Sequence, residues 1–201
     1  MAVTASPRTS PRAVFLDKDG TLIDDVPFNV DPERIRLTNG AAPALRMLAD
    51  DGYRLLVVSN QPGVALGYFG VAALADVQRR ISQLVSPIGV VIDGWYWCTH
   101  GPDDGCACRK PAAGLLRRAA RQHGLDLGSS WFIGDILDDV EAGRAVGCGT
   151  VLVDDGGETE WNLSAERRPD HIVPNLLSAA ERIVGSRVVS FSGGSSAGAV
   201  P

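Results

Sequence analysis

Short apolar runs alternate along most of the chain with longer segments of helical periodicity. The apolar runs predict strands over 13–17, 54–59, 94–97, 131–134 and 150–153, with a further short strand near His171. The helical segments are 41–51, 71–85, 112–123, 137–146 and 175–184. This alternation predicts an α/β fold, a doubly wound and mainly parallel sheet with helices on both faces.

The two ends of the chain differ in composition from the part between them. Small residues, Ser, Gly and Pro dominate both ends, and such segments bury little apolar surface. We therefore expect a flexible arm over 1–12, one domain over 13–186 and a flexible tail over 187–201. The segments that follow the first two strands are too short for a separate cap domain, so we expect a capless domain.

Composition and charge exclude several classes of protein. A hydrophobic fraction of 45% and a charged fraction of 21% are typical of a globular chain, and a net charge of −5 provides no basic surface for nucleic acid. No apolar run approaches the roughly 18 residues of a membrane span, and the amino terminus lacks the apolar segment of a secretory signal. We expect a cytoplasmic monomer with no membrane or nucleic-acid partner.

Acidic and polar residues follow three of the predicted strands. Asp17 and Asp19 follow the first, 59–61 (Ser-Asn-Gln) the second, and Asp135 the fourth. Ligands of such sheets bind beyond the carboxyl ends of the strands, where these residues should converge. Carboxylates this close repel one another unless a cation bridges them, and Mg²⁺ prefers oxygen ligands. The alternative is that Asp17 and Asp19 only form a turn, as Asp and Gly commonly do.

The same residues resemble the motifs of the haloacid dehalogenase superfamily of phosphatases. Residues 15–22 (FLDKDGTL) are similar to its first motif, Ser59 to the second, Lys110 to the third, and 134–139 (GDILDD) to the fourth. These matches occur in the family's order and span most of the chain. The resemblance makes the turn hypothesis much less plausible.

The resemblance implies a role for each matched residue. Asp17 would attack phosphorus to form an aspartyl phosphate, and Asp19 would protonate the leaving oxygen and later deprotonate water. Ser59 and Lys110 would stabilise the phosphoryl oxygens. Mg²⁺ would be held by Asp17, Asp135 and the main-chain carbonyl of Asp19.

The remaining two acidic residues of the fourth motif have less defined roles. Asp138 is compatible with a solvated helix position. Asp139 has the spacing expected of a carboxylate that orients Lys110 or a metal-bound water.

Three cysteines and a histidine cluster after the third predicted strand. Cys98, His100, Cys106 and Cys108 provide the four ligands of a tetrahedral zinc site, with no position left for water, so the metal would be structural. The alternatives are a Cys106–Cys108 disulfide, which would be strained, or a set of buried thiols. Cys148, between two glycines, is expected to be a small core residue.

This loop narrows the resemblance to one subfamily, the zinc-bearing phosphatases acting on D-glycero-D-manno-heptose 1,7-bisphosphate or histidinol phosphate. Residues 59–65 (SNQPGVA) are similar to the second-motif loop of the heptose enzymes, although Leu66 and Ile136 stand where that family has Arg and a basic residue. The matched residues predict substrate contacts, which we assign to Asp25, Val26, Pro27, Phe28, Ser59, Asn60, Gln61, Arg109 and Lys110.

The resemblance thus implies a Mg²⁺-dependent phosphomonoesterase that acts on a phosphorylated sugar and removes the C7 phosphate of heptose 1,7-bisphosphate. Histidinol phosphate or another small sugar phosphate is the alternative substrate. A signalling receiver shares the fold class, but it needs its phosphorylated Asp after a central strand, where this chain has Ser59. A noncatalytic zinc module does not explain the four charged motif residues Asp17, Asp19, Lys110 and Asp135.

Overall fold

A single parallel sheet forms the centre of the molecule. The computed structural model describes residues 10–156 and 158–191, and the sheet order is β3-β2-β1-β4-β5-β6 with every neighbouring pair parallel. The strands are β1 (Ala13–Leu16), β2 (Arg54–Asn60), β3 (Gly94–Cys98), β4 (Trp131–Gly134), β5 (Gly149–Val153) and β6 (His171–Val173). The predicted α/β architecture with a parallel sheet is confirmed.

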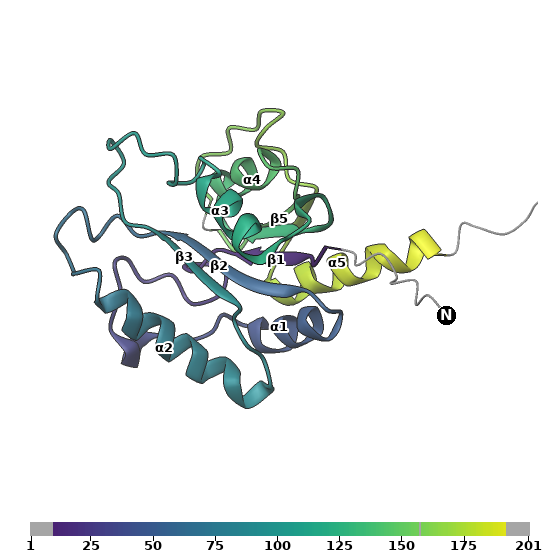
Figure 1. Cartoon of the computed structure of the whole chain (residues 1–201), viewed down its shortest axis with the longest axis horizontal. Coiled ribbons are helices and arrows are strands. Elements are labelled where there is room, and N and C mark those ends of the chain that lie inside the picture. The colour runs from purple at the N-terminus through teal and green to yellow at the C-terminus, as the bar shows by residue number, and fades with distance from the viewer. Residues whose placement is uncertain (1–9, 157, 192–201) are drawn as a thin grey trace, which may run out of the picture.

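Helices cover both faces of this sheet, with α1, α2 and α5 on one face and α3 and α4 on the other (Figure 1). They are α1 (Ala41–Asp50), α2 (Ala73–Val85), α3 (Gly114–His123), α4 (Leu137–Arg144) and α5 (Leu176–Phe191). Three short 3₁₀ helices occupy connections: Pro32–Arg34, Ser86–Ile88 and Leu127–Ser129.

The predicted ends of the chain are described only in part. Helix α5 continues to Phe191, beyond the domain boundary expected at 186, and Arg12 of the expected arm pairs with Asp51 at 2.9 Å. The rest of the predicted arm and tail, 1–9 and 192–201, lies outside the described residues.

Strand β1 shows how the sheet divides the core into two layers. Val14 and Leu16 pack into the layer of α1, α2 and α5, whereas Ala13 and Phe15 pack into the layer that includes α3. All four side chains have no exposed surface. A parallel strand buried on both faces must be continuously apolar, so the first polar residue, Asp17, marks the end of the strand.

Strand register brings the polar residues after β1, β2 and β4 to one edge. Leu16 lies opposite Val57 and Ile133, and the Asp17 amide donates a hydrogen bond to the Ile133 carbonyl at 3.0 Å. Among the described residues, the segments after β1 and β2 each contain one α-helix, one short 3₁₀ helix and turns, so no separate cap domain covers this edge.

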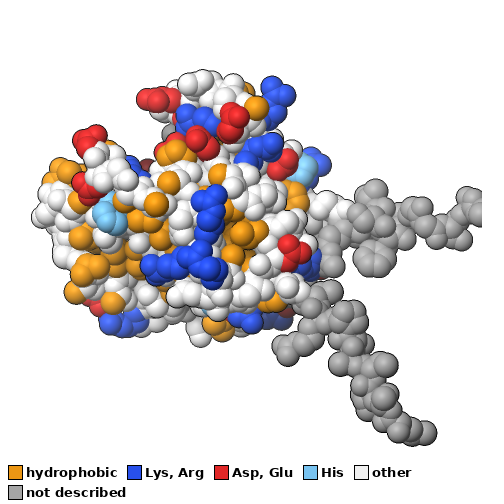
Figure 2. All heavy atoms as spheres, turned by 45° about the horizontal axis from the view of Figure 1, so that its top comes forward, with side chains coloured by type: hydrophobic (Ala, Val, Ile, Leu, Met, Phe, Trp, Pro, Cys, Tyr) orange, Lys and Arg blue, Asp and Glu red, His pale blue; other side chains and the backbone are white. Residues whose placement is uncertain are grey.

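The face of the molecule shown in Figure 2 carries side chains of mixed character and is not predominantly acidic. Acidic, basic and hydrophobic side chains all occur on that face. No helix in the described part of the chain is long and apolar enough to cross a bilayer.

Candidate active site

A small cavity of about 190 Å³ lies at the carboxyl edge of the sheet. The residues that line it are Asp17, Asp19, Asp25, Ser59, Asn60, Lys110, Asp135 and Ile136. Two larger cavities share Trp131 and Gly149, at the amino ends of β4 and β5, and none of the motif residues lines them. The predicted catalytic residues therefore meet at one place, from loops far apart in the sequence.

Lys110 is a buried cation at the centre of this cavity. Its Nζ lies 2.6 Å from Asp17 Oδ1, 2.5 Å from Asp139 Oδ1 and 3.3 Å from the Val58 carbonyl. Burial alone would lower the pKa of Lys110, but the negative charges of Asp139 and Asp17 outweigh it and raise the pKa above its usual value. Lys110 therefore stays charged where a phosphoryl group could accept its hydrogen bonds.

Asp17, Asp135 and Asp139 form a cluster of carboxylates, with oxygens within 4.8 Å of one another. Burial, followed by repulsion from Asp17 and Asp139, raises the pKa of Asp135 to about 8. Burial also raises the pKa of Asp139 to about 7, against the opposing attraction of Lys110. One ammonium does not neutralise three carboxylates, so this set of hard oxygen donors fits a divalent cation such as Mg²⁺.

Two residues after Asp19 help to hold Asp135 against the first motif. Gly20 has φ +75°, and a Cβ at this position would lie 2.2 Å from Asp135 Oδ2. Thr21 Oγ1 donates to Asp135 Oδ1 at 3.2 Å. Only glycine permits both this backbone conformation and this close approach, which explains the Gly-Thr pair after Asp19.

Asp19 is held by two neighbours that lie outside the lining of the cavity. Lys18 Nζ lies 2.9 Å from Asp19 Oδ1, and Gln61 Nε2 donates to Asp19 Oδ2 at 3.1 Å. Burial raises the pKa of Asp19, and the positive charge of Lys18 opposes that rise. Sequence reasoning missed Lys18 because it is only the spacer between two aspartates. A cation between two carboxylates was the available signal.

Asn60 links the second motif to the third through two hydrogen bonds with the backbone of Lys110. Its Nδ2 donates to the Lys110 carbonyl at 3.1 Å, and its Oδ1 accepts from the Lys110 amide at 3.0 Å. The predicted substrate residue Asn60 therefore also fixes the backbone that carries the buried ammonium.

The predicted substrate stretch 25–28 is only partly at the cavity. Asp25 lines it, whereas Val26, Pro27 and Phe28 do not. Phe28 has φ +53° and packs against Tyr68, with ring centroids 4.6 Å apart. Arg109 is also outside the lining residues, and its Nη1 is buried without a hydrogen-bond partner among the described residues.

The beginning of α4 is fastened by residues that follow β5. Asp138 pairs with Arg167 at 2.8 Å, so it is not simply solvated, while the Leu137 amide donates to Glu158 Oε2 at 2.7 Å. Asp139, the next residue, pairs with Lys110 as its spacing suggested. Nothing in the sequence indicated Glu158 or Arg167, because both lie in an irregular segment without periodicity.

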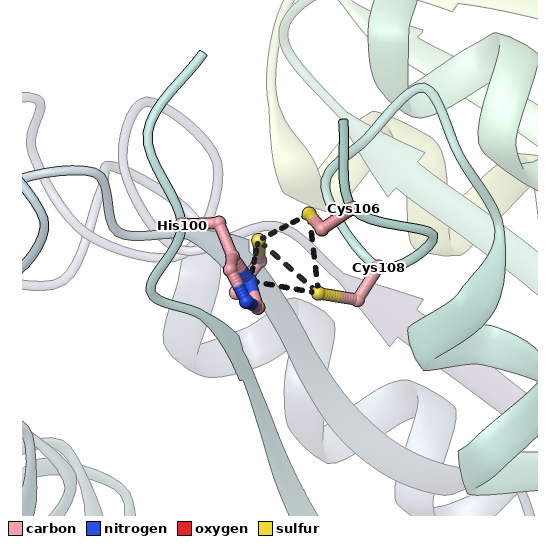
Figure 3. Close-up of side chains that lie close together, drawn as sticks. His100, Cys106 and Cys108 are labelled. Carbon is pink, nitrogen blue, oxygen red and sulfur yellow. Dashed lines mark hydrogen bonds between the residues drawn. The ribbon is translucent and has the colours of Figure 1, made fainter. Parts of the chain in front are cut away.

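The four predicted zinc ligands converge on one point, where His100, Cys106 and Cys108 face one another (Figure 3). The three Sγ–Sγ distances are 3.4, 3.5 and 3.7 Å, and His100 Nδ1 lies 3.5 Å from Cys98 Sγ and 3.2 Å from Cys108 Sγ. Tetrahedral zinc with bonds of about 2.3 Å places sulfur atoms roughly 3.8 Å apart, whereas a disulfide needs about 2 Å. The cluster fits zinc and excludes a disulfide.

The thiols of this cluster have unequal proton affinities. Burial raises the pKa of Cys98 to about 12. Burial also acts to raise the pKa of Cys106, but the backbone amides of Cys108 and Arg109 outweigh it and lower the pKa to about 7. Cys106 therefore ionises readily, and its contact with the Arg109 amide connects the cluster to the Arg109-Lys110 pair.

Comparison with known proteins shows which family this chain resembles. Residues 107–179 match the family model described as HAD-hydrolase-like. The chain is 40% identical over 146 residues to the D-glycero-beta-D-manno-heptose-1,7-bisphosphate 7-phosphatase of Pseudomonas aeruginosa, covering 71% of this chain and 81% of that protein. It is 34% identical over 176 residues to the Bordetella bronchiseptica protein of the same name, covering 86% and 98%.

A solved structure of a protein with a similar name also matches this chain in fold. The crystal structure of D,D-heptose 1,7-bisphosphate phosphatase from B. bronchiseptica, complexed with magnesium and phosphate, superposes with a TM-score of 0.75 at 30% identity. The match covers 87% of this chain and 99% of the other.

Proposed function

The chain belongs to the haloacid dehalogenase-like phosphatases, and we propose that it removes the C7 phosphate of D-glycero-D-manno-heptose 1,7-bisphosphate with the help of Mg²⁺. The observation that carries this proposal is the buried cluster of Asp17, Asp135, Asp139 and Lys110 at the carboxyl edge of the sheet. Such a cluster can hold a divalent cation beside a nucleophile and a positive charge. The relatives indicate the substrate.

Asp17 and Asp19 divide the chemistry between them. An Asp17 oxygen attacks phosphorus, the bond to the sugar oxygen breaks, and Asp19 gives its proton to that oxygen, leaving an aspartyl phosphate. Asp19 then takes a proton from water, the water oxygen attacks phosphorus, and phosphate leaves with Asp17 restored. Both residues line the cavity, Asp17 directly after β1.

The other cavity residues stabilise charge. Lys110 and the Ser59 hydroxyl donate to phosphoryl oxygens as negative charge develops on them in the transition state. Asp17, Asp135 and the main-chain carbonyl of Asp19 would hold Mg²⁺, which would neutralise negative charge so that a phosphate dianion could approach these carboxylates. Asp139 keeps Lys110 in place through the 2.5 Å ion pair.

Zinc has a structural role in this proposal. Cys98, His100, Cys106 and Cys108 fill a tetrahedral shell and leave no position for an activated water. Since Arg109 and Lys110 directly follow Cys108, a bound zinc ion would fix the loop that presents both cations. Zinc thiolates persist in reducing compartments, and we therefore place the enzyme in the cytoplasm.

Arg109 favours a substrate with two phosphates. Its Nη1 is buried without a hydrogen-bond partner in the described chain, and it neighbours the Lys110 that faces the reacting phosphate. A second anionic group would supply that partner, whereas the ammonium of histidinol phosphate would meet a like charge. Asp25, which lines the cavity and is assigned to substrate binding, is a carboxylate that could offset such a charge.

The proposal is tested by phosphate release from a panel of phosphomonoesters with Mg²⁺, and with Asp17→Asn as the inactive control. We expect kcat/KM to be highest for heptose 1,7-bisphosphate and phosphate to come from C7. Preference for histidinol phosphate would contradict the substrate assignment, and retention of near wild-type turnover in Asp17→Asn would contradict the nucleophile. Release from no phosphomonoester would instead favour a receiver or a noncatalytic zinc module.

A further inference from the structure

Both carboxylate oxygens of Asp19 are occupied by side chains from outside the substrate cavity. Lys18 Nζ lies 2.9 Å from Oδ1, and Gln61 Nε2 donates to Oδ2 at 3.1 Å. Lys18 is 1% exposed and Gln61 is 5% exposed, and neither lines the cavity. The two side chains therefore hold Asp19 without lining the cavity that would receive a phosphate ester.

The Gln61 amide also reaches the phosphoryl-binding hydroxyl. Its Nε2 donates to Ser59 Oγ at 2.9 Å, while its backbone amide donates to the carbonyl of the zinc ligand Cys98 at 2.6 Å. The buried Gln61 side chain thus connects Asp19, the proposed acid and base, to Ser59. Its backbone is held by the hydrogen bond to Cys98, at the start of the cysteine loop.

The hydrogen-bond capacity of Gln61 leaves no donor for substrate. A side-chain amide has two N–H groups, and here one goes to Asp19 and the other to Ser59. This differs from the direct substrate contact that the sequence resemblance predicted for Gln61. The residue contacts two reacting groups instead.

We propose that Lys18 and Gln61 are positioning residues that hold the Asp19 carboxyl at the leaving oxygen, one on each carboxylate oxygen, with Gln61 keeping Ser59 in register. This inference rests on the proposed phosphatase function. A general acid acts only within hydrogen-bond reach of the atom it protonates, and a misplacement of about 1 Å can cost roughly 100-fold in rate. Without its two partners, Asp19 is free to turn about its side-chain bonds.

The test compares two aryl phosphate esters whose leaving groups differ in their need for protonation by a general acid. The phenolate that leaves phenyl phosphate is basic and must be protonated as it departs, whereas the 4-nitrophenolate that leaves 4-nitrophenyl phosphate is a stable anion. The parameter is kcat/KM, which covers the steps through leaving-group departure, so later hydrolysis of the aspartyl phosphate does not enter. For Gln61→Met, we expect a loss of roughly ten- to hundredfold with phenyl phosphate and less than about threefold with 4-nitrophenyl phosphate.

Gln122→Met is the matched control, since the Gln122 carbonyl accepts from Tyr96 Oη at 2.8 Å, away from the cavity. Its ratio between the two esters should equal that of the wild type. Equal losses on both esters in Gln61→Met would show a merely structural role and overturn the inference. A wild type inactive on both aryl esters and on the sugar bisphosphate would contradict the phosphatase function itself.

Lys18 provides a second test that does not depend on the stability of Gln61→Met. Lys18→Met should show the same selective loss on phenyl phosphate, and Lys18→Arg, which keeps the cation, should lie between it and the wild type. Thermal denaturation establishes that each variant is folded under assay conditions. A folded Lys18→Met with the wild-type ratio between esters would overturn the role of Lys18.

Discussion

Lys110 and Asp139 form an ion pair of 2.5 Å in which the two side chains are 2% and 1% exposed. Asp139 belongs to the first turn of α4, so the position of that helix sets the position of the Lys110 ammonium. Removing one member of a buried pair leaves the other charge uncompensated, and such changes are more damaging than the loss of a surface pair.

The first prediction follows from this pair. In Asp139→Asn, Lys110 should shift toward Asp17 and weaken it as a nucleophile, reducing kcat roughly 100-fold. The neighbouring substitution Asp138→Asn removes only the more exposed pair with Arg167 and should change kcat little. Steady-state kinetics of the two variants decides the matter, and a larger loss in Asp138→Asn than in Asp139→Asn would contradict the assignment.

Gly20 provides a steric test of Asp135 as the proposed metal ligand. In Gly20→Ala the new Cβ would lie 2.2 Å from Asp135 Oδ2, so the carboxylate must move and Mg²⁺-dependent activity should be lost. Gly52→Ala is the matched control, because Gly52 also has positive φ but a Cβ added there would meet no atom within 4 Å. That variant should lose only roughly 1–2 kcal/mol of stability and keep its activity. Comparable activity in the two variants would contradict the close approach.

The sequence predicted which strand ends meet at the cavity, but not where every helix begins. Parallel strands bring their carboxyl ends together, so Asp17, Ser59 and Asp135 were expected to meet and do line one cavity. The start of α3 was expected at 112, but the helix begins at Gly114, whose amide donates to the Ala107 carbonyl at 3.0 Å. That tertiary hydrogen bond has no local signal.

Side-chain orientation accounts for the other differences. The motif resemblance identified Gln61 as a substrate residue, but its two amide hydrogens are directed at Asp19 and Ser59. Glu158 and Arg167 reach α4 from a segment without regular structure, so neither periodicity nor a motif could connect them to it. Such long-range contacts depend on how the chain packs, which a local pattern does not encode.

The pH dependence of magnesium binding follows from the raised pKa values of Asp135, about 8, and Asp139, about 7. In the unfolded chain these carboxyl groups ionise near pH 4, whereas in the folded, metal-free protein they stay protonated up to about pH 7 to 8. Their contribution to the free energy of unfolding is therefore lost as the pH rises through about 8. Binding of Mg²⁺ requires these carboxyl groups to lose their protons, and the bound cation would then relieve the repulsion among the carboxylates. Its stabilising effect should therefore increase from about pH 6 to about pH 8.5.

This is measured as the shift in Tm on adding Mg²⁺ at the two pH values. In Asp135→Asn, where the group with the more strongly raised pKa is removed, the difference between the two shifts should decrease. A Mg²⁺-induced shift that is larger at the lower pH would contradict the carboxylate cluster as the binding site.

Zinc content gives a prediction with its own matched cysteine control. Cys106→Ser should lose zinc and raise KM, since the loop that presents Arg109 and Lys110 loosens. Cys148→Ser replaces a buried cysteine outside the cluster and should retain the metal. Elemental analysis of protein purified without chelators measures both. Wild-type protein that is fully active without zinc would refute a structural role for the metal.

The substrate prediction depends on Arg109, whose buried Nη1 lacks a hydrogen-bond partner among the described residues. If the second phosphate of a sugar bisphosphate fills that role, Arg109→Ala should reduce kcat/KM for heptose 1,7-bisphosphate roughly 10- to 100-fold, the size of a charge-assisted hydrogen bond. The same variant should change little with heptose 7-phosphate, which lacks the second phosphate but presents the same reacting group. Arg121→Ala, an exposed arginine near the end of α3, controls for loss of positive charge alone and should affect both substrates equally. Equal losses on both substrates in Arg109→Ala would mean that Arg109 acts on the reacting phosphate or on the loop itself. The preference for a bisphosphate would then need another cation, and the uncharged Leu66 and Ile136 do not provide one.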